Sequence, residues 1–360
     1  MHEIAANENH RSGIRRVTVI GHGAVGSALV DEWSVRGELY SVWDPKPERC
    51  MVPPAGERWS PDSDARLLGD SDARLLPDEG VGNVPDANEG ERMVGHKKAS
   101  GDLRTSPSVA SDLGDWIFLA VRDASIASVV DELASIPCDW SQKTVLHLSG
   151  SLGLSLLQPI AEKGASIASM HPLQTFTFPS GRSSLAGIFY SLMGDDAVTS
   201  TLKNWVMDVG GTCERVTEEQ KQQLHLAAVF GSNYMVALFR VVESILGETF
   251  PVSVLDPIVR TTLDKILAQG ASNSLSGPVQ RGDVDTVRRH LGQLQGDPAR
   301  LRLYRLLGLE ALRIAEGDGA DEHGSDGQSP DGHGSDGQTH IASRRRRLEE
   351  LRTLLEEKLG

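Results

Sequence analysis

RRVTVIGHGAVGSALVDEWSVRG, residues 15–37, is the stretch that decides the fold. Its first part, 15–21, is rich in β-branched and apolar residues, which is typical of a buried strand. After the glycines, apolar side chains recur at helical spacing as far as Trp33, and LYSVWD (39–44) follows as a second strand. Strand, glycine turn, helix and strand form a βαβ unit, whose two strands lie parallel.

The same alternation continues along the chain. Further strand-like runs stand at 115–121, 144–150, 165–170 and 187–194, most of them followed by a helical pattern. From Glu218 onward the sequence reads as successive helices without a convincing strand. We therefore predict an α/β, Rossmann-like, doubly wound and mainly parallel sheet over residues 14–216, followed by an all-helical domain over 217–316.

Two acidic, repetitive segments interrupt this pattern. DSDARLLG is followed at once by DSDARLLP, and HGSDGQ occurs twice. These repeats are too short for a solenoid, so we interpret 51–106 as a low-complexity insertion and 317–343 as a disordered linker. His323 and His333 in the linker are of a metal-binding type, but a plain flexible linker is favoured and we expect no metal site.

The end of the chain, SRRRRLEELRTLLEEKL, predicts a separate amphipathic helix over 344–360. Its leucines fall on one side: Leu348, Leu351, Leu355 and Leu359. Such a helix can dock on the body of the protein, pair with a partner or remain solvated, and the sequence leaves all three open.

Composition narrows the classes of function. The 360 residues suggest one large or two ordinary domains, and 39% hydrophobic residues are enough for a core. The first residues lack a secretory signal, and no run approaches about 20 apolar residues, so we expect no membrane association. Cys50, Cys138 and Cys213 lack metal or CxxC spacing, which favours reduced thiols in a cytoplasm. Most of the net charge of −14 lies in the acidic segments, and we expect no nucleic-acid binding.

The glycine turn has the pattern of a phosphate cradle. Gly21, Gly23 and Gly26 form G-x-G-x-x-G between a strand and a helix, which is the context that makes this motif informative. Gly21 permits the tight turn, Gly23 lets the backbone approach a pyrophosphate, and Gly26 lets helix and strand pack closely. The free N–H groups of the helix then face the negative charge. A tight turn without a ligand is the alternative.

Asp44 follows the second strand, where a carboxylate can accept the ribose hydroxyls of an adenosine and repel a 2′-phosphate. This favours NAD slightly over NADP. Lys46 and Arg49 weaken the preference, because cations there suit a 2′-phosphate. A simple turn residue before Pro45 is the alternative reading of Asp44.

Polar residues follow three later strands. Ligands of a doubly wound sheet lie beyond the carboxyl ends of its strands, so these residues should share one edge. They are Arg122, Asp123, Ser149, Ser151, His171, Gln174 and Thr175. His171 leaves its strand at Met170 and can donate or accept a proton near neutral pH; each residue could also be a satisfied turn residue.

The first helical segment carries a polar strip. Lys221, His225 and Ser232 fall on one side of the predicted helix, with Asn233 beside them. The strip faces a ligand or ties helices together by hydrogen bonds. Farther on, Arg281 could clamp a substrate carboxylate, although pairing with Asp283 or Asp285 is slightly favoured; Asp283 is a predicted helix cap.

Five pieces of this sequence together resemble a known family. They are GHGAVGSAL, HLSGS, SMHPLQTF, HLAAVFGSNYMVAL and SGPVQRGDVDTVRRHL, in this order. The pattern is similar to that of a bacterial two-domain family described as a Rossmann-like domain followed by domain of unknown function 2520. The resemblance covers about residues 14–315 apart from the insertion. Where members often carry a Ser-Arg type sequence that suits NADP, this chain has WDP around Asp44.

The family is similar to pyrroline-5-carboxylate reductase and the 6-phosphogluconate dehydrogenase superfamily, which reduce imines or oxidise hydroxy acids. In those relatives the helical domain commonly forms the dimer, which implies a homodimer here. We therefore predict an NAD(P)-dependent oxidoreductase acting on a small imine, keto acid or hydroxy acid; the alternative is a non-catalytic dinucleotide-binding redox sensor.

The predicted residues fall into three groups. His171 and His225 are the catalytic candidates. The substrate-binding candidates are Gln174, Thr175, Ser232, Asn233 and Arg281. The cofactor-binding candidates are Gly21, Gly23, Ala24, Val25, Gly26, Asp44, Val121, Arg122 and Ser149.

Overall fold

The computed structural model describes residues 13–44, 106–176, 185–317 and 335–357. The chain divides into two compact units, Met1–Tyr234 and Met235–Gly360. The predicted insertion at 51–106 lies almost wholly outside the described residues, as do His323, His333 and Leu359.

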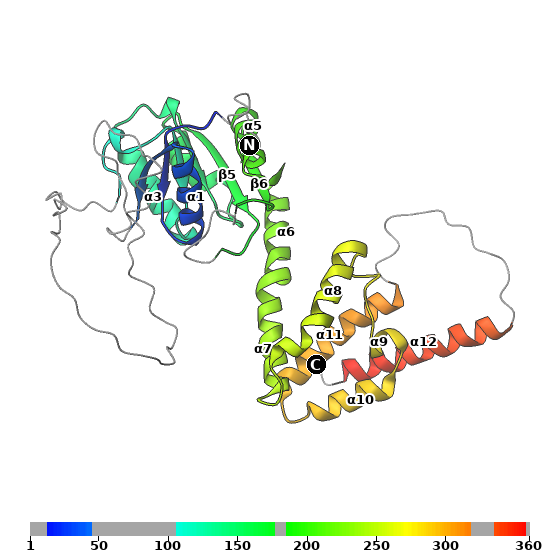
Figure 1. Ribbon diagram of the computed structural model, residues 1–360. Coiled ribbons are helices and arrows are strands. Elements are labelled where there is room, and N and C mark those ends of the chain that lie inside the picture. Colours follow the sequence, from blue (N-terminus) through cyan, green and yellow to red (C-terminus); the bar gives the residue numbers. More distant parts are fainter. Residues whose placement is uncertain (1–12, 45–105, 177–184, 318–334, 358–360) are drawn as a thin grey trace, which may run out of the picture. The chain divides into compact units, whose positions relative to one another are not determined.

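The first unit, which contains α1, α3 and β5 in Figure 1, is built on one sheet. This sheet has seven strands in the order β2-β1-β3-β4-β5-β6-β7. The strands are β1 Val17–Ile20, β2 Leu39–Trp43, β3 Trp116–Leu119, β4 Thr144–His147, β5 Ser166–Pro172, β6 Phe189–Gly194 and β7 Thr212–Arg215. Neighbouring strands from β2 to β5 are parallel, β6 is antiparallel to β5, and β7 is parallel to β6. This confirms the predicted Rossmann-like, mainly parallel sheet; the sequence patterns did not single out β7.

Helices cover the sheet on both faces. They are α1 Ala24–Val35, α3 Asp123–Ser135, α4 Gln158–Ala161 and α5 Asp196–Asp208, with short helical turns η2 Ala110–Asp112, η3 Trp140–Gln142 and η4 Leu154–Leu157. On one face Trp33 of α1 stacks on Trp205 of α5 with ring centroids 5.0 Å apart. On the other face Ile126 and Val130 of α3 and Ile160 of α4 enter a second apolar core. The parallel strands are buried on both faces, which is why they read as continuous apolar runs.

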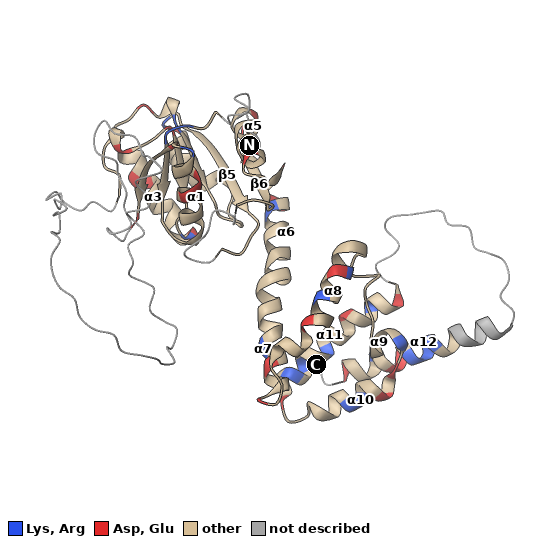
Figure 2. Cartoon of the chain, viewed as in Figure 1, with Lys and Arg blue, Asp and Glu red and all other residues tan. Residues whose placement is uncertain are grey.

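A long helical stretch begins at Thr217, whose side chain accepts from the N–H of Gln220 in a capping box. It comprises α6 Glu218–Ala228, a π-helical turn η6 Val229–Asn233 and α7 Tyr234–Leu246. By length and composition, the described chain has one helix able to cross a membrane, Glu218–Leu246, with a mean hydropathy of 1.3. The helix meets this criterion because no charged residue stands between Lys221 and Arg240 (Figure 2), although polar residues such as His225, Ser232 and Asn233 interrupt its apolar residues. One helix of this kind is weak evidence for a membrane span.

The second unit is helical, as predicted. After α7 come η7 Val252–Leu255, α8 Asp256–Gln269, α9 Pro278–Arg281, α10 Val284–Gln293, α11 Pro298–Glu316 and α12 Ser335–Glu356. Helix α12 docks on this unit: Leu348, Leu351 and Leu355 are buried against Val287 of α10 and Leu312 of α11. Of the three alternatives for the end of the chain, the structure shows the docked one.

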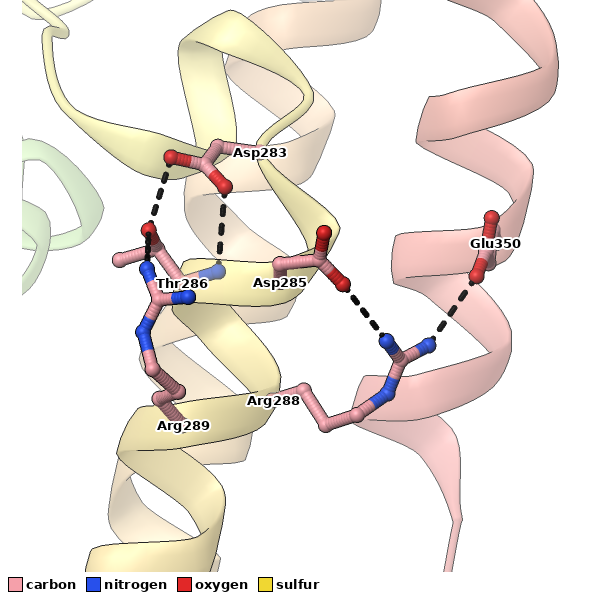
Figure 3. Close-up of polar contacts among 6 residues, drawn as sticks. All are labelled: Asp283, Asp285, Thr286, Arg288, Arg289 and Glu350. Atoms are coloured by element: carbon pink, nitrogen blue, oxygen red, sulfur yellow. Dashed lines mark hydrogen bonds and ion pairs between the residues drawn. The ribbon is translucent and has the colours of Figure 1, made fainter.

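Helix α12 begins nearer the N-terminus than predicted. The expected linker 317–343 overlaps its first turns, because the polar run before Ser343 has no apolar periodicity to reveal a helix. Gly308 of α11 makes room for the docked helix, since a Cβ there would lie 2.8 Å from Cδ2 of Leu355. A polar bridge completes the contact: Arg288 of α10 donates to Asp285 at 2.8 Å and to Glu350 of α12 at 3.2 Å (Figure 3).

Candidate functional site

The three glycines of the first turn have different surroundings. Gly21 has φ +97°, and a Cβ there would lie 2.7 Å from the carbonyl of Ala120. A Cβ at Gly26 would lie 2.0 Å from the carbonyl oxygen of Gly21. Gly23, in contrast, has no atom within 4 Å of the place of a Cβ. Gly21 and Gly26 therefore serve the packing of strand and helix, and Gly23 leaves open space at the N-terminus of α1.

That open space belongs to a cavity at the carboxyl ends of β1, β2 and β3. Its volume is about 630 Å³, within the usual range for small-molecule sites. Of the predicted cofactor-binding residues, those lining it are Gly21, Gly23, Asp44, Val121 and Arg122. The lining also includes Ser106, Pro107, Ser125 and Glu132, which the sequence patterns did not indicate. Ala24, Val25, Gly26 and Ser149 are not among the lining residues.

Asp44 stands at the wall of this cavity directly after β2. Its carboxylate is 7% exposed and accepts from the backbone N–H of His22 at 2.7 Å. This hydrogen bond fixes the carboxylate beside the glycine turn. An oriented acceptor at this place is suited to the hydroxyls of a ribose, as the sequence predicts.

The loop after β4 is tied to the start of α3. Asp123 accepts from the hydroxyls of Ser149 at 2.7 Å and Ser151 at 3.1 Å. The Ser149 oxygen in turn accepts from the N–H groups of Ser151 and Leu152 at 3.3 and 3.2 Å. Three residues predicted at one edge of the sheet thus form one hydrogen-bonded group, which holds the 148–152 loop in place.

The two predicted catalytic histidines meet across this loop. The ring centroids of His171 on β5 and His225 on α6 lie 6.0 Å apart at an interplanar angle of 72°. Gly150 lies against both rings: a Cβ there would be 2.6 Å from Nδ1 of His225 and 2.8 Å from Nε2 of His171. The strand runs through Pro172, two residues beyond the predicted end at Met170, so His171 belongs to the strand itself.

The protonation state of His171 follows from its surroundings. Its Nδ1 lies 3.0 Å from the carbonyl oxygen of Leu148, which assigns the proton to Nδ1 and leaves the lone pair on Nε2. Burial lowers the pKa of His171, and the charges of Lys221 and His225 lower that pKa further. The imidazole is therefore neutral near pH 7, with an acceptor nitrogen on the side of Gly150.

Lys221 is buried beside the histidines. Its side chain is 1% exposed, and its Nζ donates to the carbonyl of Leu152 at 2.8 Å and to the hydroxyl of Ser169. Burial lowers the pKa of Lys221 to about 8, against the opposing influence of Asp123 and Glu218. The sequence placed this lysine on the polar strip but gave it no role in the site.

The rest of the polar strip does not join this group. Ser232 donates to the carbonyl of Ala228 at 2.7 Å within its own helix, and the side chain of Asn233 lies beside it at 2.9 Å. Both belong to the π-helical turn η6, a kind of distortion that is frequent at functional sites.

The remaining substrate-binding candidates are exposed. The side-chain oxygen of Gln174 accepts from the N–H of Thr175 at 2.8 Å, on the turn that leaves β5. Arg281 belongs to the second unit and ends α9. Within the described ranges its guanidinium makes no ion pair, because Asp283 caps α10 through Thr286 and Asp285 pairs with Arg288 (Figure 3). The pKa of Asp283 is lowered mainly by its hydrogen bonds with Thr286, and the charge of Arg281 contributes to the same shift. Arg281 therefore interacts electrostatically with Asp283 without forming a direct ion pair.

His147 is a functional candidate that the sequence reasoning missed. It ends β4, is fully buried, and its Nε2 lies 3.0 Å from the carbonyl oxygen of Gly153. Burial lowers the pKa of His147 to about 4, with a further contribution from Lys221. The sequence signal for His147 was its position in HLSGS, at the carboxyl end of a predicted strand, where ligands of such a sheet lie.

Two family models match the chain. The model described as a Rossmann-like domain matches residues 97–172, and the model described as domain of unknown function DUF2520 matches residues 188–311. The chain joins a Rossmann-like domain to a DUF2520 domain. The DUF2520 match begins at β6 and ends within α11, so α12 lies outside it. The resemblance read from the five sequence pieces is confirmed.

Solved structures share the fold of this Rossmann-like and DUF2520 chain at low sequence identity. A Bacteroides fragilis protein named as a candidate NADP oxidoreductase is 18% identical, with a TM-score of 0.57 over 85% of this chain and 100% of that one. A Thermotoga maritima protein is 20% identical, with a TM-score of 0.54 over 84% and 99%. A reductive aminase from Aspergillus terreus, solved with NADPH and ethyl levulinate, is 16% identical, with a TM-score of 0.50 over 86% and 96%. No curated protein matches the sequence. These likenesses show that the chain shares its fold with these structures.

Proposed function

We propose that this protein is an NAD(P)-dependent oxidoreductase that acts on a small imine, keto acid or hydroxy acid. The observation that carries the proposal is that the glycine cradle and the candidate catalytic residue His171 lie along the same edge of the sheet. The glycine cradle follows β1, Arg122 follows β3, the 148–152 loop follows β4, and His171 lies on β5. These four strands are neighbours in the sheet in this order. A dinucleotide seated at Gly23 therefore has its path along this edge toward the imidazoles.

The fit of a dinucleotide rests on the cradle itself. Gly23 gives backbone access to a diphosphate, where a larger residue would fill the space. The N-terminus of α1 carries no acidic residue in its first turn and no side-chain cap, so its N–H groups are suited to negative charge. When bound, the nicotinamide would supply or accept a hydride.

The reaction also requires a group of the protein that donates a proton to the substrate or accepts one from it. Nε2 of neutral His171 is an acceptor toward Gly150, and His225 stands across the same space. One imidazole can hold the proton that the substrate gains or loses while the other orients the reacting group. Gln174, Thr175, Ser232 and Asn233 remain candidates for hydrogen bonds to the substrate, and Arg281 remains a candidate for binding a carboxylate.

Asp44 supports NAD over NADP. The carboxylate is held at the cavity wall by the N–H of His22, so it cannot simply turn away from a 2′-phosphate. Bringing a phosphate against this fixed negative charge costs binding free energy. Arg122 lines the same cavity and offsets part of this effect.

The experiment that tests the proposal combines binding with turnover. NADH and NADPH titrations, followed by nicotinamide fluorescence, should show binding with tighter affinity for NADH. A screen of imines, 2-keto acids and hydroxy acids should find a substrate whose turnover falls at least roughly tenfold in His171→Ala or His225→Ala. Binding without turnover of any substrate would favour the redox sensor, and no binding of either dinucleotide would overturn the proposal.

We also propose a homodimer formed through the helical unit. Several large apolar side chains of this unit are exposed, with Leu267 the most at 85%. They include Val236, Ile245, Ile258, Leu267, Leu306 and Leu307. Monomers rarely leave so much apolar surface in water. Sedimentation velocity should show a dimer, and Leu267→Asp should shift it toward monomer.

A further inference from the structure

Helix α6 and strand β5 meet in two parallel contacts. Lys221 and His225 are four residues apart on α6 and so lie on one face, one turn from each other. Ser169 and His171 are two residues apart on β5 and so point to the same side of the strand. Lys221 contacts Ser169, and His225 faces His171. The lysine–serine contact therefore runs beside the histidine pair and shares both of its supporting elements.

The 148–152 loop touches residues of both contacts. The carbonyl of Leu148 accepts from His171, and the carbonyl of Leu152 accepts from Lys221. Gly150, midway between them, lies against both imidazoles. One ammonium group thus joins the helix, the strand and the loop on which the imidazole pair depends.

We propose that Lys221 is the positioning residue of this site, whose ammonium joins α6, β5 and the 148–152 loop and thereby fixes the separation of His171 and His225. The choice of a lysine is informative. A buried cation is costly unless paired, and Lys221 forms no ion pair within the described residues, only hydrogen bonds to neutral oxygens. Lysine at this position therefore does more than fill space.

The charge of Lys221 has a second consequence. It opposes protonation of His171, as does the charge of His225, whereas Asp123 favours that protonation. His171 in turn opposes protonation of the buried His147. Asp123 and Glu218 are the acidic groups that stabilise the ammonium itself. With the lysine protonated near neutral pH, His171 stays neutral and keeps its Nε2 lone pair. The value of this arrangement for catalysis rests on the proposed function. The contacts of Lys221 themselves are present without a bound substrate.

The test compares Lys221→Met, which keeps the length of the side chain without its charge, with Lys221→Arg, which keeps the charge. Lys163→Met, at an exposed lysine of the same unit, is the matched control. The imidazole resonances would be titrated by NMR in the full chain, with His171 assigned from His171→Gln. We expect the pKa of His171 to rise by roughly 0.5–1 in Lys221→Met, and to stay within about 0.2 of the wild-type value in Lys221→Arg and Lys163→Met. An unchanged pKa of His171 in Lys221→Met would overturn the inference that the charge of Lys221 keeps His171 neutral.

Ser169→Ala tests the positioning part and guards against a Lys221→Met chain that does not fold. It removes one acceptor of the ammonium at a fully buried position with little change in volume. We expect cross-relaxation between the rings of His171 and His225 to weaken at least roughly twofold as their separation grows. Cross-relaxation in Ser169→Ala equal to that of the wild-type protein would overturn the positioning role of Lys221. Failure of the wild-type protein to bind either NADH or NADPH would instead overturn the proposed function, and the two failures are distinguishable because these NMR measurements need no cofactor.

Discussion

The imidazole rings of His171 and His225 lie 6.0 Å apart, with Gly150 against both of them. They come from a strand and a helix that are separated by some fifty residues of sequence. Two imidazoles brought together at the edge of a parallel sheet are candidates for a role in binding or chemistry.

Gly150→Ala should disable the histidine pair while leaving the cradle intact. The new methyl group would lie 2.6 Å from Nδ1 of His225, so one imidazole must move. We expect turnover of any substrate found in the screen to fall roughly a hundredfold, because small displacements of reacting groups are costly. NADH affinity, measured by fluorescence, should change less than about twofold. Gly292→Ala, where a Cβ meets no atom within 4 Å, is the control.

Gly23→Ala and Gly26→Ala should have opposite effects. A methyl group at Gly23 fits without a clash and occupies the space of the diphosphate, so stability should be kept and NADH affinity should fall at least roughly tenfold. At Gly26 the methyl group would collide with the carbonyl of Gly21, so the melting temperature should fall by about 4 °C or more. Equal NADH binding by wild type and Gly23→Ala would contradict the cradle.

Asp44→Asn should relax the preference between the two cofactors. The amide oxygen can still accept from the N–H of His22, while the negative charge is removed. We expect the ratio of NADPH to NADH dissociation constants to fall by roughly tenfold, which corresponds to about 1.4 kcal/mol. Parallel titrations with both cofactors measure this ratio. A ratio equal to that of wild type would show that Asp44 does not set the preference.

His147 should make the stability of the protein fall in mild acid. Its folded-state pKa of about 4 lies below the ordinary value of 6.5, so the unfolded chain binds the proton first as the pH falls. The stabilising effect is fully present above pH 6.5 and is lost as the pH falls toward 4, by about 3 kcal/mol in total. Urea unfolding at pH 7, 5.5 and 4.5 should show a clear slope. In His147→Gln the slope should be shallower.

Leu351→Ala should destabilise the helical unit by about 2–5 kcal/mol. Leu351 is fully buried between α12 and the helices beneath it. Hydrogen exchange should show faster opening of α10 and α11 in the variant, since α12 covers both. Thr353→Ala, at an exposed position of the same helix, is the control and should change stability by less than about 0.5 kcal/mol. Unaltered protection in Leu351→Ala would mean that α12 adds no stability.

The βαβ unit, the mainly parallel sheet and the switch to helices could be predicted from the sequence. These features follow from local rules. The spacing of apolar residues and the positions of glycines are local features of the sequence. They were therefore enough to predict the turn at Gly21 and the close packing at Gly26. The edge that carries Asp44, Arg122, Ser149 and His171 followed from the same reasoning, because parallel strands place their carboxyl ends together.

Only the tertiary structure decided which polar residues meet. The packing of α6 against the sheet edge brings Lys221 and His225 against β5, whereas Ser232 hydrogen-bonds within its own helix. Helical periodicity puts all three on one face and cannot say how far along the helix the contact extends. Gly150 reads as an ordinary turn glycine until two imidazoles from distant elements are packed against it. Such contacts depend on the packing of elements far apart in sequence, which no local pattern encodes.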